Sequence, residues 1–228
     1  MLIWLYKTRP DMLFTINLLA RFLRAPTQRH LDLARGRPLR YLRGTTTAGV
    51  CFLRATGTWV LSGQSDAGFA DDLATSRSTR GHFFRFGDFG AVSFNCVLER
   101  KLCTSTQQAE TYALASACRD AEFLRLLSWD LGFEQSEASQ VDVDNEGAYQ
   151  QSTKQINHAT AKHFRVAQHF IRWMSNRCQI RVVKVHTSVN GADMFTKALP
   201  ADSFRRHRSL VMGPQSAPDS VQCNPVRG

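Results

Sequence analysis

Four carboxylates from distant parts of the chain stand where predicted strands end or predicted helices begin. Asp66 follows the apolar run that starts at Trp59, and Glu110 lies in the first turns of a long helix. Asp144 ends a short strand, and Asp193 begins the last helix. Carboxylates that meet repel one another unless cations lie between them, so their convergence predicts hard metal ions with oxygen ligands. Two Mg²⁺ ions about 4 Å apart would suit hydrolysis of a phosphodiester, because one activates water and the other stabilises the leaving oxygen.

Each acid also has an ordinary structural interpretation when it is taken singly. A lone Asp66 would be a turn residue after a strand, and a lone Glu110 would favour the dipole of its helix. Asp144 with Asn145 would form a turn, and Asp193 would cap a helix. The choice between these roles and a metal site depends on whether the four acids meet in space.

The periodicity of the sequence predicts the elements that must position these acids. Strands are expected over 49–54, 59–67, 80–86, 91–98, 140–144 and 180–186, with a turn at Thr56-Gly57. Helices are expected over 11–24, 30–42, 105–131, 161–178 and 191–197, the last ended by Pro200, with a small helix through Tyr149. Short connections make three consecutive strands antiparallel, and the crossover through the long helix makes the next strand parallel. The prediction is an α/β fold with a mixed sheet and helices on both faces.

Positive charge is concentrated at the two ends of the sequence. The net charge is +10, and the isoelectric point is near 9.8. Residues 1–44 contain nine Lys or Arg against two Asp or Glu, about +7, and residues 201–228 contain four against two. The middle is nearly neutral and holds most of the acids. This distribution favours a polyanionic partner whose phosphates are held at the edges of the molecule.

The length allows one sizeable domain with an appendage. Residues 1–44 are a basic helical piece with too little apolar surface to stand alone, and the main domain covers 45–212. The tail, 213–228, is rich in Pro, Ser and Gln and is expected to be disordered. Six cysteines without a Cys-x-x-Cys pair, several of them inside apolar periods, indicate reduced core residues of an intracellular protein. No apolar run approaches the ~20 residues that span a bilayer, so no membrane partner is expected.

A second group of residues is given structural roles. Trp59 and the phenylalanines at 83, 84 and 94 are expected in the core and not as platforms for bases. Asp71 and Asp72 are expected to be solvated loop acids. The role of Asp142 is left open, because its direction depends on whether the strand bulges.

Seven ordered motifs resemble the ribonuclease H domain of copia-type retrotransposon Pol polyproteins. They are Ser65-Asp66-Ala67-Gly68-Phe69-Ala70-Asp71, Arg77-Ser78-Thr79-Arg80-Gly81, Ala109-Glu110-Thr111-Tyr112-Ala113-Leu114, Asp142-Val143-Asp144-Asn145, Lys162-His163-Phe164, His169-Phe170-Ile171-Arg172 and Ala192-Asp193-Met194-Phe195-Thr196-Lys197-Ala198-Leu199-Pro200. Their order and spacing hold from about Tyr41 to Met212. Ahead of them, Thr8-Arg9-Pro10-Asp11 and Tyr41-Leu42-Arg43-Gly44-Thr45 resemble the end of the reverse transcriptase and its connection to that domain.

The resemblance implies a ribonuclease H-like fold with a five-stranded mixed sheet. It also implies an enzyme that cuts the RNA strand of an RNA–DNA hybrid with two Mg²⁺ ions, for which Mn²⁺ is an alternative. Carried onto matching positions, it makes Asp66, Glu110, Asp144 and Asp193 the metal-binding carboxylates. The implied partner is the remainder of the reverse transcriptase polyprotein, with residues 1–44 as the remnant of its thumb or connection. The implied location is the cytoplasm, in virus-like particles, with the nucleus as a second compartment.

Five further residues are candidates for work on the substrate. His186 ends a strand near Asp193 and could shuttle a proton or help product leave, although a strand-end histidine is ordinarily structural. Four side chains share one face of the 161–178 helix: Lys162, Arg165, His169 and Arg172. Such a face is ordinarily solvated, but with a hybrid as substrate it becomes a candidate grip for phosphates.

Two departures from the family pattern bear on activity. Gln108 stands where the family commonly has Glu, two residues before Glu110, but this position is not one of the four ligands. The polymerase motif with paired aspartates is absent, so this chain is not expected to copy nucleic acid by itself. The alternatives to an active nuclease are a non-catalytic nucleic-acid-binding remnant of a decayed element and a relic that folds poorly.

Overall fold

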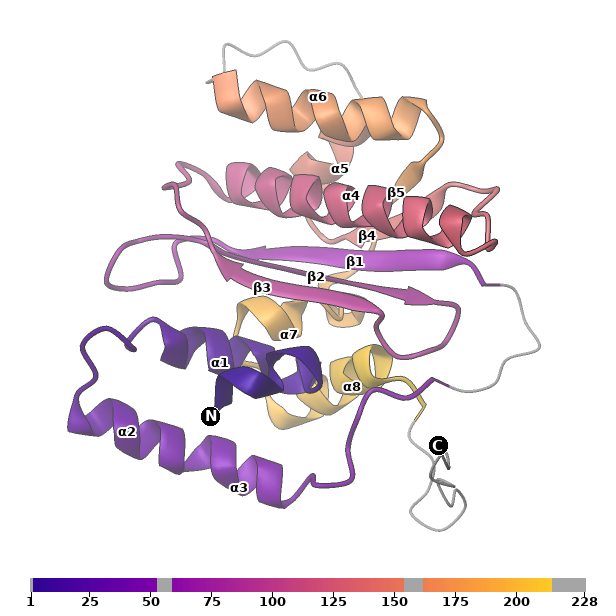
Figure 1. Ribbon diagram of the computed structural model, residues 1–228. Helices are drawn as coiled ribbons and strands as arrows, with labels where there is room; N and C mark the ends of the chain where they lie inside the picture. Colours follow the sequence, from indigo (N-terminus) through magenta and orange to yellow (C-terminus); the bar gives the residue numbers. More distant parts are fainter. Residues whose placement is uncertain (1, 53–58, 154–161, 215–228) are drawn as a thin grey trace, which may run out of the picture.

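The computed structural model describes residues 2–52, 59–153 and 162–214, and its centre is a five-stranded mixed sheet in the order β3-β2-β1-β4-β5 (Figure 1). The strands are β1 (Leu61–Gly68), β2 (Thr79–Phe86), β3 (Ser93–Leu98), β4 (Ser139–Val143) and β5 (Ile180–Lys184). Strands β1, β2 and β3 pair antiparallel, whereas β4 runs parallel to both β1 and β5. The predicted α/β fold with a mixed sheet is confirmed.

Helices cover both faces of the sheet (Figure 1). One face carries α4 (Thr106–Asp130), with α5 (Glu146–Thr153) and α6 (Lys162–Asn176) beyond it. The other face carries α1 (Leu13–Ala20), α7 (Asp193–Thr196) and α8 (Ala201–Met212), with α2 (Gln28–Arg35) and α3 (Arg37–Arg43) further out. Three short 3-10 helices complete the described elements: η1 (Leu2–Lys7), η2 (Pro10–Met12) and η3 (Thr187–Val189).

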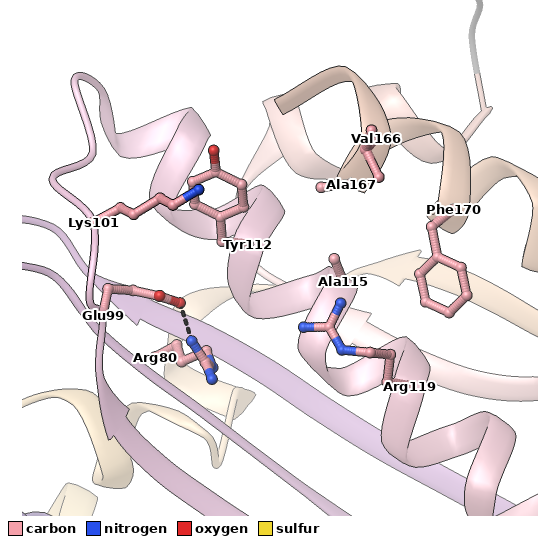
Figure 2. Close-up of a pocket in the computed structure, with 9 residues that line it drawn as sticks. All are labelled: Arg80, Glu99, Lys101, Tyr112, Ala115, Arg119, Val166, Ala167 and Phe170. Atoms are coloured by element: carbon pink, nitrogen blue, oxygen red, sulfur yellow. Dashed lines mark hydrogen bonds and ion pairs between the residues drawn. The ribbon is translucent and has the colours of Figure 1, made fainter. Parts of the chain in front are cut away.

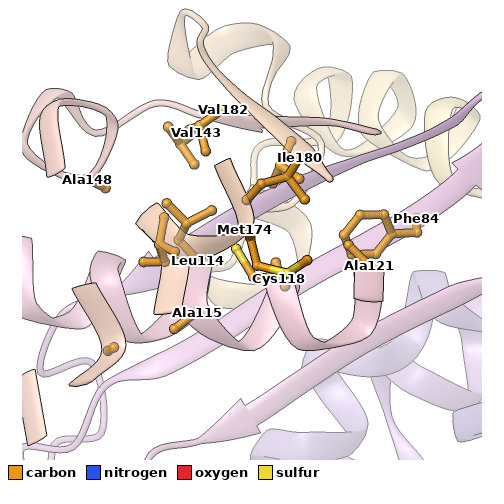
Figure 3. Packing of buried hydrophobic residues seen from close by; sticks show 14 of the residues in the cluster. Phe84, Leu114, Ala115, Cys118, Ala121, Val143, Ala148, Met174, Ile180 and Val182 are labelled. Atoms are coloured by element: carbon orange, nitrogen blue, oxygen red, sulfur yellow. The ribbon is translucent and has the colours of Figure 1, made fainter. Parts of the chain in front are cut away.

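The larger hydrophobic core lies between the sheet and α4 (Figure 3). Leu114, Cys118 and Ala121 recur at helical spacing on α4 and are fully buried against the sheet, where Phe84 faces them. Met174 of α6 joins the same core from the outer layer. Because the alanine and cysteine side chains are small, α4 can lie close to the strands that hold the candidate acids.

A second buried cluster lies on the opposite face of the sheet. It brings together Leu13 of α1, Phe83 of β2, Phe195 of α7 and Val211 of α8. Successive strand residues point to opposite faces, so Phe83 and its neighbour Phe84 belong to different cores. This cluster fixes α7, which carries Asp193, against β1 and β2.

The N-terminal helices are tied to the main domain by buried charges. Arg9 and Asp11 form an ion pair of 2.8 Å, and Tyr41 donates a hydrogen bond of 2.6 Å to Asp11 Oδ2. Arg21, directly after α1, forms an ion pair of 3.0 Å with Asp72. The prediction that Asp71 and Asp72 are solvated loop acids is wrong, because both lie within ion-pair distance of Arg21. The domain boundary at residue 44 stays a prediction.

Several predicted elements differ from the structure. Residues 49–52 form no strand; instead Cys51 N–H donates to Met212 O at 2.8 Å, which ties this segment to the end of α8. The rest of that predicted strand, the turn at Thr56-Gly57 and most of the tail lie outside the described residues. The predicted 30–42 helix is two helices, α2 and α3, separated at Gly36. The sequence pattern predicts no helix after Pro200, which is expected to end the last helix. In the structure Pro200 directly precedes a further helix, α8.

Trp59 is not a core residue. It is 45% exposed and stacks on Phe133, with ring centroids 5.3 Å apart, at the end of the sheet where β1 begins. The cysteines in the described ranges are all free, as expected. Among the helices of these ranges, none has the length and apolar character needed to cross a bilayer.

Candidate functional site

The parallel pairing of β1 with β4 places two of the candidate acids side by side. Gln64 of β1 is opposite Asp142 of β4. Because the two strands are parallel, Asp66 and Asp144, each two residues further on, lie at the same edge of the sheet. Asp66 is buried and lies near the end of β1. Asp144 is half-buried and follows directly after β4. Two carboxylates therefore meet at the carboxyl ends of adjacent parallel strands.

The third acid comes from the first turns of α4. Ser105 caps this helix by accepting a hydrogen bond from Gln108 N–H at 3.2 Å, and Glu110 lies in the buried part of the helix that follows. Gln108, which stands where the family commonly has Glu, thus supplies the backbone N–H that the Ser105 cap binds. One carboxylate oxygen each of Asp66, Glu110 and Asp144 lies within 4.8 Å of the other two.

Asp193 lies beside this trio and reaches it through a lysine. It is buried at the start of α7, and its Oδ1 lies 2.9 Å from Lys197 Nζ. The same Nζ is 4.0 Å from Asp66 Oδ2, and the Thr196 hydroxyl donates a hydrogen bond to that oxygen. The structure therefore gathers three of the four predicted acids within shared ligand distance and links the fourth to them by an ion pair.

Helix α7 can approach the sheet this closely because of a glycine and an asparagine. A Cβ at Gly81, which is opposite Asp66 in the β1–β2 register, would stand 2.5 Å from Phe195 Cβ. Asn190, fully buried, donates a hydrogen bond of 3.0 Å to Ser65 O and accepts one from Ala192 N–H at 3.2 Å. The position of Asp193 thus depends on contacts to β1 and β2.

Burial and like charge perturb these acids in one direction. Burial raises the pKa of Asp66 to about 7; the Lys197 charge opposes the rise and the Asp193 charge adds to it. Burial raises the pKa of Glu110 to about 9, and the charges of Asp66 and Asp144 add to the rise. Burial also raises the pKa of Asp193, against the hydrogen bond from Lys197. The cluster therefore favours either bound protons or a bound cation.

A divalent metal ion fits the donor set. Carboxylate oxygens are the ligands that hard cations prefer, and Asp66, Glu110 and Asp144 offer three of them from separate elements. A cation between the carboxylates would offset the burial and the repulsion that raise the pKa values of Asp66 and Glu110. The trio can therefore hold a metal ion where the parallel strands end.

The other predicted site residues are exposed or half-buried. His186 is exposed and caps η3, with its Nδ1 accepting a hydrogen bond from Ser188 N–H at 3.2 Å. On α6, Lys162, Arg165 and His169 are exposed and Arg172 is half-buried. The predicted shared face of α6 is thus open to solvent, in the outermost layer of the fold (Figure 1).

Sequence reasoning missed Lys197 and Thr196 as members of the site. A usable signal was present, because a lysine four residues after an acid on a helix lies on the same face. The direction of Thr196 toward Asp66 had no such signal, since 130 positions separate the two residues.

The fold and this site define a ribonuclease H-like domain with a buried carboxylate cluster. No model of a known protein family matches the chain. The chain is 34% identical over 204 residues to the retrovirus-related Pol polyprotein from transposon TNT 1-94 of Nicotiana tabacum, covering 90% of this chain and 15% of that protein. It is 31% identical over 204 residues to the Pol polyprotein from transposon RE1 of Arabidopsis thaliana, covering 90% and 14%. The chain belongs to this family of copia-type Pol polyproteins and spans about 15% of the length of the curated relatives.

A third relative bears a different name. Secreted RxLR effector protein 161 of Plasmopara viticola is 38% identical over 117 residues, covering 51% of this chain and 80% of that protein. Among solved structures, LC11-RNase H1 isolated from compost aligns with a TM-score of 0.47 at 14% identity, covering 60% of this chain and 92% of that chain. The foamy viral protease-reverse transcriptase in complex with RNA/DNA hybrid aligns with a TM-score of 0.46 at 13% identity, covering 64% and 21%. We assign the fold from the strand order and pairing described above.

Proposed function

We propose that this domain is a metal-dependent endonuclease that hydrolyses the RNA strand of RNA–DNA hybrids, as one part of a retrotransposon polyprotein. The observation that carries the proposal is the trio of buried Asp66, buried Glu110 and half-buried Asp144, which offer one carboxylate oxygen each within 4.8 Å of one another. Membership of the Pol polyprotein family supports the choice of substrate. The proposed partners are the hybrid and the remainder of the polyprotein.

In the proposed mechanism, the trio would hold Mg²⁺, with Mn²⁺ as an alternative, and Asp193 would offer a carboxylate oxygen to a second ion. The bound ions would activate water for attack on the phosphorus and stabilise the oxygen that leaves. Thr196 holds Asp66 in place through its hydroxyl. Lys197 balances the charges of Asp66 and Asp193. Every acid is thus held by a fixed element or a neighbouring side chain before the substrate arrives.

The remaining predicted residues would act on the rest of the substrate. The exposed side chains of Lys162, Arg165 and His169 on α6, with Arg172, would bind hybrid phosphates. His186, exposed on the loop between β5 and α7, would assist proton transfer or product release. Replacing His186 by Ala should then lower turnover without changing the affinity for the hybrid.

The test is cleavage of a labelled RNA–DNA hybrid by the purified chain in Mg²⁺ and in EDTA. Wild-type protein should cut the RNA strand of the hybrid but not double-stranded DNA, and only with the metal. Asp144→Asn should abolish cleavage, because it removes a charged ligand from the trio. The matched control is Asp88→Asn, whose carboxylate is fully exposed between β2 and β3 and should leave the rate unchanged. Salt-sensitive hybrid binding without cleavage by the wild-type chain would instead identify a non-catalytic remnant.

A further inference from the structure

A cavity of about 400 Å³ lies between α4, α6 and the β2–β3 edge of the sheet (Figure 2). Tyr112 and Arg119 of α4 line it at a spacing of seven residues, two helical turns, so they share one face. Glu110 lies about 200° around the helix from Tyr112, at 100° per residue. The cavity is therefore on the side of α4 that faces away from the carboxylate trio.

The polar wall of the cavity carries an excess of positive charge. Arg80 of β2 forms an ion pair with Glu99, so these two charges balance (Figure 2). Lys101 and Arg119 are exposed, and in the described part of the chain neither makes an ion pair or a side-chain hydrogen bond. The Arg80 Nε is buried and has no hydrogen-bond partner among the described residues. Lys101, Arg119 and the Arg80 Nε–H are thus available to bind an anionic group.

The opposite wall is apolar and belongs to α6. Ala167 and Phe170 face the cavity, and the Phe170 ring is held by stacking on Trp173, with centroids 6.1 Å apart and an interplanar angle of 18°. Figure 2 shows Phe170 above Arg119 and Tyr112 beside Lys101. An aromatic wall opposite free cations suits a ligand with a flat apolar part and a negative part. The volume lies in the range of cavities that hold small molecules.

We propose that this cavity binds a nucleotide, with its phosphate on Lys101 and Arg119 and its base against Phe170. A free nucleotide and one nucleotide of a single strand present the same chemistry. The neighbouring residues favour a strand, because exposed Arg165 and His169 of α6 directly precede Val166 and Phe170, which line the cavity, and offer further donors for phosphates. The proposal does not depend on the nuclease activity, since the cavity shares no residue with the carboxylate trio.

The test is titration of the full chain in EDTA with three probes: adenosine, 5′-AMP and a twelve-nucleotide oligo(dA). EDTA prevents metal-dependent cleavage, so failure of the nuclease proposal would leave these titrations unaffected. AMP should bind at least tenfold more tightly than adenosine. Lys101→Gln and Arg119→Gln should each weaken AMP binding about tenfold, as expected for a hydrogen bond to a charged group. Phe170→Leu should weaken AMP but not inorganic phosphate.

The matched control is Arg205→Gln, an exposed arginine of α8 on the opposite face of the sheet. It should change AMP binding less than twofold. For oligo(dA), the double variant at 101 and 119 should reduce the slope of log K against log salt by about 0.7, because about 0.7 is lost for each phosphate contact with a single strand and the two side chains hold one phosphate. AMP binding that depends on Lys101 and Arg119 without this change in slope assigns the cavity to free nucleotides; a change in slope assigns it to a strand.

Three outcomes would overturn the proposal. Adenosine could bind as tightly as AMP, the Lys101 and Arg119 variants could bind AMP as the wild type does, or Arg205→Gln could weaken binding as much as they do. In the unmodified protein, AMP should shift the NMR signals of Tyr112 and Phe170. That measurement needs no variant, and shifts confined to other parts of the chain would also contradict the proposal.

Discussion

The two sides of α4 carry like-charge clusters of opposite sign and opposite exposure. Toward the sheet, buried Glu110 meets buried Asp66 and half-buried Asp144. Away from it, Lys101 and Arg119 stand open to solvent around the cavity. Asp66 and Glu110 have raised pKa values, because burial disfavours their charged forms and the charges of the neighbouring acids add to the rise. Burial therefore decides what a like-charge cluster requires: the acids need a cation or protons, whereas the exposed cations are screened by water and salt.

The largest expected difference is in catalysis. Glu110→Gln should lower metal-dependent hybrid cleavage at least about 10³-fold, because a neutral amide is a poor ligand for a hard cation. The measurement is single-turnover cleavage at saturating protein. Asp130→Asn, an exposed acid at the end of the same helix, should leave the rate unchanged. Equal rates for Glu110→Gln and wild type would exclude Glu110 from the metal site.

The second difference is in the dependence of stability on pH. The folded-state pKa values of Asp66 and Glu110, about 7 and about 9, exceed the ordinary values of 3.8 and 4.5, so the folded state binds more protons. Without metal, the free energy of unfolding should therefore fall as the pH rises from the ordinary pKa of each acid to its folded-state pKa. The slope is about 1.4 kcal/mol per pH unit for each proton that the folded state binds and the unfolded state does not. The loss is complete above the folded-state pKa values.

Thermal unfolding from pH 6 to pH 9 in EDTA and in Mg²⁺ would measure this effect. Mg²⁺ should flatten the fall, because the ion replaces the protons. Glu110→Gln should flatten the upper part of the EDTA curve, from pH 7 to pH 9, because the amide does not ionise. The same pH dependence with and without the metal would contradict the assignment of the trio as a metal site.

A smaller effect is expected from the lysine inside the acidic site. Lys197→Met should lower the melting temperature in EDTA by about 2–4 °C, roughly 1 kcal/mol, because it removes the cation shared by Asp66 and Asp193. The loss should shrink in Mg²⁺, which supplies the missing positive charge. Lys197→Arg keeps the charge and is the control. A loss of the same size with and without the metal would indicate that Lys197 contributes packing and not charge.

The smallest effect is expected on the other side of the helix. Arg119→Gln should change the free energy of unfolding by less than about 0.5 kcal/mol in EDTA and in Mg²⁺, because its side chain is exposed and unpaired within the described ranges. Denaturant unfolding would measure it. A large destabilisation would show that Arg119 has a structural partner and would remove the contrast between the two clusters.

Local pattern predicted the elements that carry the acids. The long helix expected over 105–131 and the short strand expected before Asp144 follow from the properties of neighbouring residues, and both were confirmed, as α4 and β4. The end of α7 and the start of α8 were harder to predict. Pro200 is compatible with the end of one helix and the start of the next, and only the contact of Val211 with the second core favours the latter.

The side chains that depend on distant contacts were the ones predicted wrongly. The local sequence around Asp72 predicts a solvated loop acid, but in the structure it accepts a hydrogen bond from Arg21, 51 positions away. Trp59 reads as a core residue because it precedes an apolar strand, but β1 begins at Leu61 and Trp59 stacks on Phe133 near the surface. In both cases the missing information was which segment lies next to the residue.

The sequence by itself determined most of the helices and strands, the mixed sheet and the identity of the candidate acids, because these follow from periodicity and ordered motifs. Only the tertiary structure decided that Asp66, Glu110 and Asp144 share one site, that Lys197 joins Asp193 to it, and that free cations line a cavity behind α4. The physical reason is that a pKa, an ion pair or a cavity depends on distances and burial between residues far apart in the chain, which local preferences do not set.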